Sequence, residues 1–97
     1  MKLANASYTL YHRARSADGS ETLEELGSGL GWLEDEVQWR IVEGELKVVA
    51  NGILYVWEDP PEGADAVAIN GKRWEIVRIS RFQDHLNRFH HAEVWVR

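Results

Sequence analysis

The side chains in this chain best suited to chemistry are its histidines and carboxylates. His90 and His91 are neighbours just before an alternating apolar run. In a strand their rings point to opposite faces, so the pair would not bind one metal ion. A metal or catalytic site would need distant partners such as His12, Asp84 or His85, because no helical His-x-x-x-His or Cys/His spacing is present. We therefore expect no metal site, one half-buried hydrogen-bonded histidine and one exposed histidine.

Carboxylates cluster at residues 34–36 and 58–62, and a pair of acids is what glycoside hydrolysis needs. Both clusters fall at strand ends or beside turn residues, which predicts solvated loop charge. No serine lies in a Gly-x-Ser-x-Gly elbow. The glycines of residues 27–31 lack the lysine and the following helix of a phosphate loop, so they indicate a flexible tether. The sequence thus predicts no enzyme, no catalytic residue and no cofactor.

Length and composition favour one globular domain spanning residues 1–97. Apolar residues make up 44% of the chain, and the formal charge of −5 argues against a nucleic-acid binder. The absence of cysteine excludes disulfides and cysteine-ligated zinc. No apolar run is long enough to cross a bilayer, and the first residues carry no apolar signal core. We therefore expect a protein that is made in a cytoplasm and does not bind a membrane.

Alternating apolar residues and turn residues predict about seven strands: 7–12, 37–42, 46–49, 53–57, 66–69, 73–79 and 89–96. Two Asn-Gly pairs, at 51–52 and 70–71, each predict a type I′ hairpin turn, and Glu43-Gly44 allows another tight turn. Tight turns without helical crossovers exclude a parallel α/β sheet. The expected fold is all-β and mainly antiparallel, a small closed or partly open barrel of about six to seven strands.

Two polar segments, at about 14–31 and 80–88, are predicted to be mobile loops. In the first, Thr22 and Glu25 have the spacing of a capping box, which allows a single helical turn ending at Gly27. We expect at most this one short helix, because so few residues rarely hold a helix alone.

Aromatic residues are the candidates for protein contacts. On the last strand, His90 is expected to share the core face with the apolar residues Ala92, Val94 and Val96, which leaves the alternate residues outside. Exposed aromatic side chains on a small protein often mark a contact surface. For Trp57 and Trp95, simple core packing is the alternative. The interface candidates are Trp57, Phe82, Leu86, Phe89, His91 and Trp95.

A family resemblance is carried by "AVAINGKRWEIVRI", a polar loop and "HHAEVWVR" in the last third of the chain. This part resembles the small β-barrel connector proteins of tailed bacteriophages, which form the head–tail neck and are called head closure, stopper or head–tail joining proteins. The early "YTLYHR" is similar to the opening strand of small phage minor capsid proteins. The matching residues are Gly71, Lys72, Trp74, Glu75, Ile76 and Val77, followed by His90, His91, Glu93 and Val94.

The resemblance implies a non-enzymatic virion structural protein in the neck, made in the host cytoplasm. Such a protein forms a homo-oligomeric ring, binds portal or adaptor proteins and tail proteins, and lets genomic DNA pass its lumen without sequence-specific binding. The segments 14–31 and 80–88 would then order on assembly. The alternatives are a tail completion or terminator protein, a small phage-encoded regulatory protein that binds and inhibits a host protein, and a β-barrel enzyme using His90 or His91.

Overall fold

The computed structural model describes residues 4–97, which form eight strands and no helix. All strand pairs are antiparallel, so the expected all-β antiparallel fold is confirmed. Among these residues no helix exists that could cross a membrane. The strands are β1 (Ala6–Arg15), β2 (Glu21–Glu34), β3 (Gln38–Val42), β4 (Glu45–Ala50), β5 (Gly52–Val56), β6 (Ala66–Ile69), β7 (Lys72–Gln83) and β8 (Phe89–Val96).

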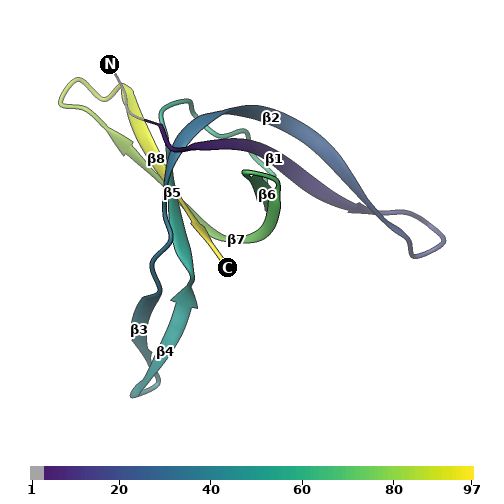
Figure 1. The fold of residues 1–97 in the computed structure, drawn as a ribbon, viewed down its shortest axis with the longest axis horizontal. Helices are drawn as coiled ribbons and strands as arrows, with labels where there is room; N and C mark the ends of the chain where they lie inside the picture. The colour runs from purple at the N-terminus through teal and green to yellow at the C-terminus, as the bar shows by residue number, and fades with distance from the viewer. Residues whose placement is uncertain (1–3) are drawn as a thin grey trace.

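Six of the strands close into a barrel in the order β1-β2-β5-β8-β7-β6, while β3 and β4 form a separate two-stranded sheet. Figure 1 shows that three ribbons project from this barrel: the outer part of β1 and β2, the β3–β4 pair, and the end of β7 and β8. We call residues 12–24 the β1–β2 arm and residues 35–51 the β3–β4 arm. The β1–β2 arm continues two strands of the barrel wall, which fixes the direction in which it projects, whereas short non-strand segments join the β3–β4 arm to β2 and β5.

The core is built from residues that alternate along the barrel strands. Leu54 and Val56 of β5 are fully buried, and so are the residues paired with them on β8, Val94 and Ala92. Period-two alternation predicts this arrangement, since successive side chains of a strand point to opposite faces. The expected inward face of the last strand is confirmed for Ala92, Val94 and Val96.

The prediction of a loop over residues 14–31 is wrong for most of that range, because β2 occupies residues 21–34 and pairs with β1. The expected helical turn is absent from it. Two of the glycines of β2 lie close to neighbouring groups. A Cβ atom added at Gly29 would lie 2.8 Å from the Tyr8 hydroxyl oxygen, and one added at Gly31 would lie 2.6 Å from the Tyr55 carbonyl oxygen. These glycines therefore make room for a buried tyrosine ring and a neighbouring backbone, which is a structural need and not that of a tether.

Of the two predicted Asn-Gly hairpins, only one forms. Asn70 and Gly71 have φ of 51° and 85° and join β6 to β7, as a type I′ turn requires. The turn between β3 and β4 at residues 43–44 has the same pair of positive φ values, 53° and 80°. Asn51-Gly52 is instead the junction at which the β3–β4 arm re-enters the barrel. Gly52 is needed there because an added Cβ would lie 3.0 Å from the Glu34 carbonyl oxygen.

The second expected loop, 80–88, is shorter than predicted. Strand β7 continues to Gln83, so the connection to β8 spans residues 84–88. Asp84 organises this turn: its Oδ1 accepts hydrogen bonds from the backbone N–H groups of Leu86 at 2.8 Å and Arg88 at 3.0 Å. Strand β5 stops at Val56, which leaves Trp57 just outside the strand in which it was expected.

Candidate interaction surface

The outer wall of the barrel carries an aromatic surface. Tyr55 of β5 is paired with Trp32 of β2 on one side and with Glu93 of β8 on the other. Directly paired residues point to the same face of a sheet, and the adjacent Leu54 and Val56 point inward. The row therefore faces outward, and β7 and β8 extend it. We call this surface the aromatic face; it consists of Trp32, Tyr55, Phe82, His91 and Trp95.

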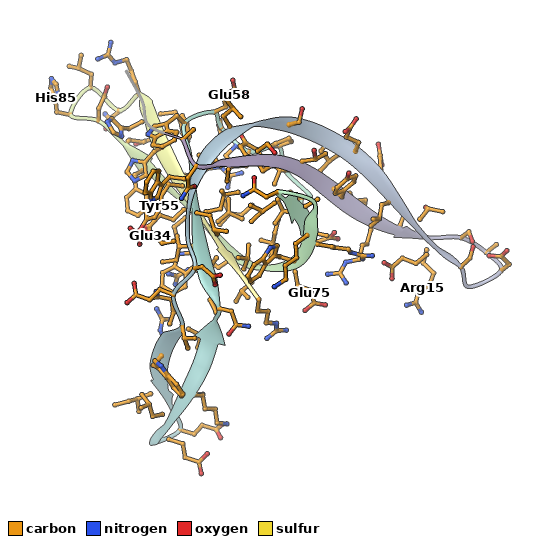
Figure 2. The ribbon with its side chains drawn as sticks, in the orientation of Figure 1. Arg15, Glu34, Tyr55, Glu58, Glu75 and His85 are labelled. Atoms are coloured by element: carbon orange, nitrogen blue, oxygen red, sulfur yellow. The ribbon has the colours of Figure 1, made fainter. Side chains whose placement is uncertain are left out.

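The aromatic face has a local negative charge around Tyr55. Figure 2 shows Tyr55 and Glu34 close together on the outer side of the wall, where the Tyr55 hydroxyl donates a hydrogen bond of 3.3 Å to Glu34 Oε2. Partial burial raises the pKa of Tyr55, and the carboxylates of Glu34, Glu93 and Glu36 raise it further. The tyrosine therefore stays protonated and serves as a hydrogen-bond donor within an acidic setting.

The two adjacent histidines lie closer together than a regular strand allows. The pairing of β7 with β8 skips His90, because Phe82 is opposite His91 and Gln83 is opposite Phe89. Such a bulge turns neighbouring side chains toward one side. The two Nδ1 atoms are 2.8 Å apart, which is a hydrogen-bond distance and shorter than the ~3.3 Å expected for two nitrogens on one tetrahedral ion. In residues 4–97 no group of three or more metal-ligating side chains occurs.

The bulge corrects two predictions about this strand. His90 is exposed and does not share the core face, whereas His91 is half-buried and stacks on Phe82 with the ring centroids 4.7 Å apart. Phe89 packs against the core cluster instead of standing beside His91 on the outer surface. The prediction from strict alternation fails here because His90 is an extra residue in the strand, and it reverses the face to which the preceding residue, Phe89, points.

Trp95 faces outward as predicted and is half-buried, with the Arg78 guanidinium 4.3 Å from its ring centre. This is the geometry of a cation–π contact. Its indole N–H is buried and has no hydrogen-bond partner among the described residues. Of the other interface candidates, Leu86 is exposed in the β7–β8 turn and Trp57 is half-buried beside the barrel. Phe82 and His91 thus stack on each other, and Trp95 lies on the same outer face four residues further along β8, whereas Leu86 and Trp57 lie apart from them.

The β3–β4 arm exposes an apolar side that was not among the interface candidates predicted from the sequence. Trp39, Ile41 and Leu46 are 58%, 72% and 64% exposed. Ile41 is directly opposite Leu46, so the three share one face of the ribbon. An isolated two-stranded ribbon is marginally stable in water. A partner that covers these apolar side chains would therefore stabilise the arm.

A concave site lies where the β3–β4 arm meets the barrel. It has a volume of about 230 Å³ and is lined by Arg40, Val49, Val77, Arg78 and Trp95. We call it the basic groove. Arg40 faces the barrel here, so Trp39 and Ile41 on either side of it point away from the protein's own barrel. The apolar side of the arm is therefore available to another molecule.

The loop carboxylates are solvated, as expected. Each residue of the clusters at 34–36 and 58–59 is exposed, and Asp59 accepts a 2.8 Å hydrogen bond from Arg81 Nε. A second concavity of about 180 Å³ lies near this pair, between Pro60, Pro61 and β1–β2. Glu58 and Asp59 are among its lining residues, and Arg81 forms an ion pair with Asp59.

Two residues of the phage-connector resemblance have structural roles. Trp74 is buried in the core, and Glu75 joins two parts of the barrel. The Glu75 carboxylate accepts hydrogen bonds of 3.3 Å from Arg97 Nε and from Arg13 Nη1. These contacts hold β1 and the residue after β8 against β7. They also lower the pKa of Glu75, the bond from Arg97 most and the bond from Arg13 next.

The lowered pKa of Glu75 predicts a pH-dependent contribution to stability. A carboxyl whose folded-state pKa is below its ordinary value of 4.5 stabilises the fold above that pH and loses this effect as the pH falls through the folded-state pKa. We expect Glu75→Gln to lower the melting temperature at pH 7 and to match the wild type at pH 2.5. Thermal unfolding followed by circular dichroism measures this. A deficit of equal size at both pH values would contradict the ion-pair role.

Comparison with models of known protein families, with curated proteins and with solved structures found no match. Its own geometry therefore defines the class of protein: a small closed β-barrel with projecting β-arms, an outward aromatic face and an apolar arm surface. The aromatic face and the apolar arm surface both consist of side chains that are typical of protein contacts.

Proposed function

We propose that this protein is a non-enzymatic structural component of a tailed-phage neck. It assembles with copies of itself into a ring that joins the portal and capsid to the tail. The observation that carries this proposal is the exposed apolar side of the β3–β4 arm, Trp39, Ile41 and Leu46. Large exposed apolar surfaces on small proteins belong at protein interfaces.

The sequence resemblance adds the phage context. Its matching residues lie in the Asn70-Gly71 turn and on the adjacent strands β7 and β8, and the buried Trp74 is one of them. They support the barrel as a scaffold, as expected for a family whose members share a fold and not a reaction. The genome passes through the lumen of the ring without sequence-specific contacts. A tail completion protein would use the same surfaces with a different axial partner.

Self-assembly and partner binding are tested together. Light scattering on the purified chain, alone and mixed with a portal complex, is expected to detect a ring-sized oligomer or a stable portal complex. Ile41→Lys places a charge in the apolar arm surface and should abolish either product without changing the circular dichroism spectrum. The matched control, Lys47→Arg, keeps the charge on the other side of the same arm. A wild type that stays monomeric and binds neither portal nor tail components refutes the proposal.

The aromatic face supports a second candidate, a regulatory protein that binds and inhibits a host protein. Trp, Tyr and Arg dominate binding hot spots, and Trp32, Tyr55 and Arg78 provide them on one wall. Affinity capture from host lysate separates the two candidates. A regulatory protein would retain one host protein in equal molar amount, and Trp32→Ala should release it. A neck protein would retain none.

A further inference from the structure

Two charged features at different ends of the molecule have complementary chemistry. The first is the basic groove. Its two arginines, Arg40 and Arg78, form no ion pair with any carboxylate in residues 4–97. Arg78 is held over the Trp95 ring, and two valines complete the lining. Guanidinium groups at a concave, partly apolar site are suited to bind a carboxylate.

The second feature is the turn at the end of the β1–β2 arm, residues 16–20, which we call the tip turn. Asp18 lies at its centre and is fixed by hydrogen bonds to its Oδ1. The donors are the Ser16 hydroxyl, the Ser20 backbone N–H at 3.0 Å and the Ser20 hydroxyl at 2.7 Å. The hydroxyl of Ser16 and then the groups of Ser20 lower the pKa of Asp18 to about 2. The carboxylate is thus ionised at any physiological pH.

The shape of the tip turn suits a small concavity. Asp18 is flanked by Ala17 and Gly19, so it projects without bulky neighbours. Its Oδ2 atom has no hydrogen-bond partner among the described residues and is available to a new donor. A groove of about 230 Å³ holds roughly the volume of seven or eight water molecules, which is enough for one such side chain and part of the turn.

We propose that the tip turn of one copy of this chain enters the basic groove of a second copy, with the Asp18 carboxylate between the guanidinium groups of Arg40 and Arg78. This inference rests on the proposed self-assembly and names one of its contacts. Figure 1 shows that the tip turn and the β3–β4 arm project in different directions, so the contact joins two molecules. The two surfaces differ, so the contact is head-to-tail and repeats from copy to copy, as ring formation requires.

Single-charge variants test the contact in the full chain. Asp18→Asn keeps the Oδ1 acceptor and hence the turn, but removes the charge. It should weaken self-association about tenfold or more, the usual effect of removing one partner of a desolvated charge pair. Arg40→Glu should weaken it further. The matched controls are Glu24→Gln on the same arm as Asp18 and Glu43→Gln in the turn of the arm that carries Arg40, and both should stay within about twofold of the wild type. Sedimentation velocity at graded protein concentrations gives the self-association constant of each variant.

A mixing experiment tests the head-to-tail arrangement. Asp18→Arg has a defective tip and an intact groove, whereas Arg40→Glu has an intact tip and a defective groove. Each variant alone should be monomeric, and the mixture should form a 1:1 complex through the one intact contact. Self-association of the wild type should also weaken as salt rises from 50 to 500 mM, values at which exposed charges are progressively screened.

The outcomes separate this inference from the proposed function. Wild-type oligomers that are unaffected by Asp18→Asn and Arg40→Glu overturn the contact and leave the ring in place. A mixture of the two defective variants that stays monomeric overturns the head-to-tail geometry. A wild type that remains monomeric at millimolar concentration overturns the contact, and the portal and tail binding experiment then decides the proposed function by itself.

Discussion

Replacing Gly31 with alanine is expected to destabilise the barrel by about 3 kcal/mol, the upper end of the usual cost of overpacking. The new Cβ would lie 2.6 Å from the Tyr55 carbonyl oxygen and 3.1 Å from Leu54 Cδ1. The first contact is with backbone in the adjoining strand, so relief requires β2 and β5 to separate where they pair. A domain of this size has a total stability of roughly 5–10 kcal/mol, so the loss is a large share of it.

Urea denaturation of the Gly31→Ala variant measures the effect as a lower midpoint. Ser28→Ala is the matched control, because residue 28 is on the same strand but exposed, and its change should stay within about 0.5 kcal/mol. An alanine at position 31 with wild-type stability would show that β2 and β5 are not in the close register described here.

Truncation of Leu54 to alanine is expected to cost about 3 kcal/mol, within the 2–5 kcal/mol range for buried leucines. Leu54 is fully buried at the centre of the core cluster, with β2 paired on one side of its strand and β8 on the other. The surrounding wall is closed, so neighbouring strands have little freedom to collapse into the space. Most of the cavity is therefore retained.

Leu30 provides a matched control for Leu54, since it is also a barrel-strand leucine but is 67% exposed. Leu30→Ala should change the free energy of unfolding by less than about 0.5 kcal/mol. Chemical denaturation of both variants gives the comparison. Equal effects of the two truncations would mean that the inner and outer faces of the barrel have been assigned incorrectly.

Sequence patterns predicted the strands whose apolar residues alternate. The last strand was located at its observed bounds, Phe89–Val96, because its inward valines repeat with period two. The Asn70-Gly71 turn was found because positive φ at two successive positions needs those residue types. In such elements local chemistry and long-range packing favour the same structure, which is why single-sequence reasoning succeeds.

The errors occurred where a partner strand decides the structure. Nothing local marks residues 21–27 as a strand, since their backbone pairs with β1 and their side chains are mostly exposed. Asn51-Gly52 has the sequence of a hairpin turn, but the strands on either side of it pair with other strands. The bulge at His90 has no sequence signature, and it reverses the facing of Phe89.

The aromatic face was predicted in part. Phe82, His91 and Trp95 were among the candidates, whereas Trp32 and Tyr55 were not, because their alignment depends on the pairing of β2 with β5. A usable signal was present in the glycines at 27, 29 and 31, whose spacing of two places the residues between them on one outward face. That periodicity indicates a strand, and Trp32 continues its outward side.

The unbroken course of β1 and β2 from the barrel wall into their arm has a mechanical consequence. Strand β2 alone has 14 residues, a span of about 46 Å at the usual rise of a strand. A force on the far end of this ribbon is carried along hydrogen-bonded backbone to the two seams that join the ribbon to the rest of the wall, where β1 meets β6 and β2 meets β5, and each seam has only four residue pairs. The arm therefore acts as a lever, and under a sideways pull we expect the barrel to open first along these two short seams and not between β5 and β8 or between β7 and β8.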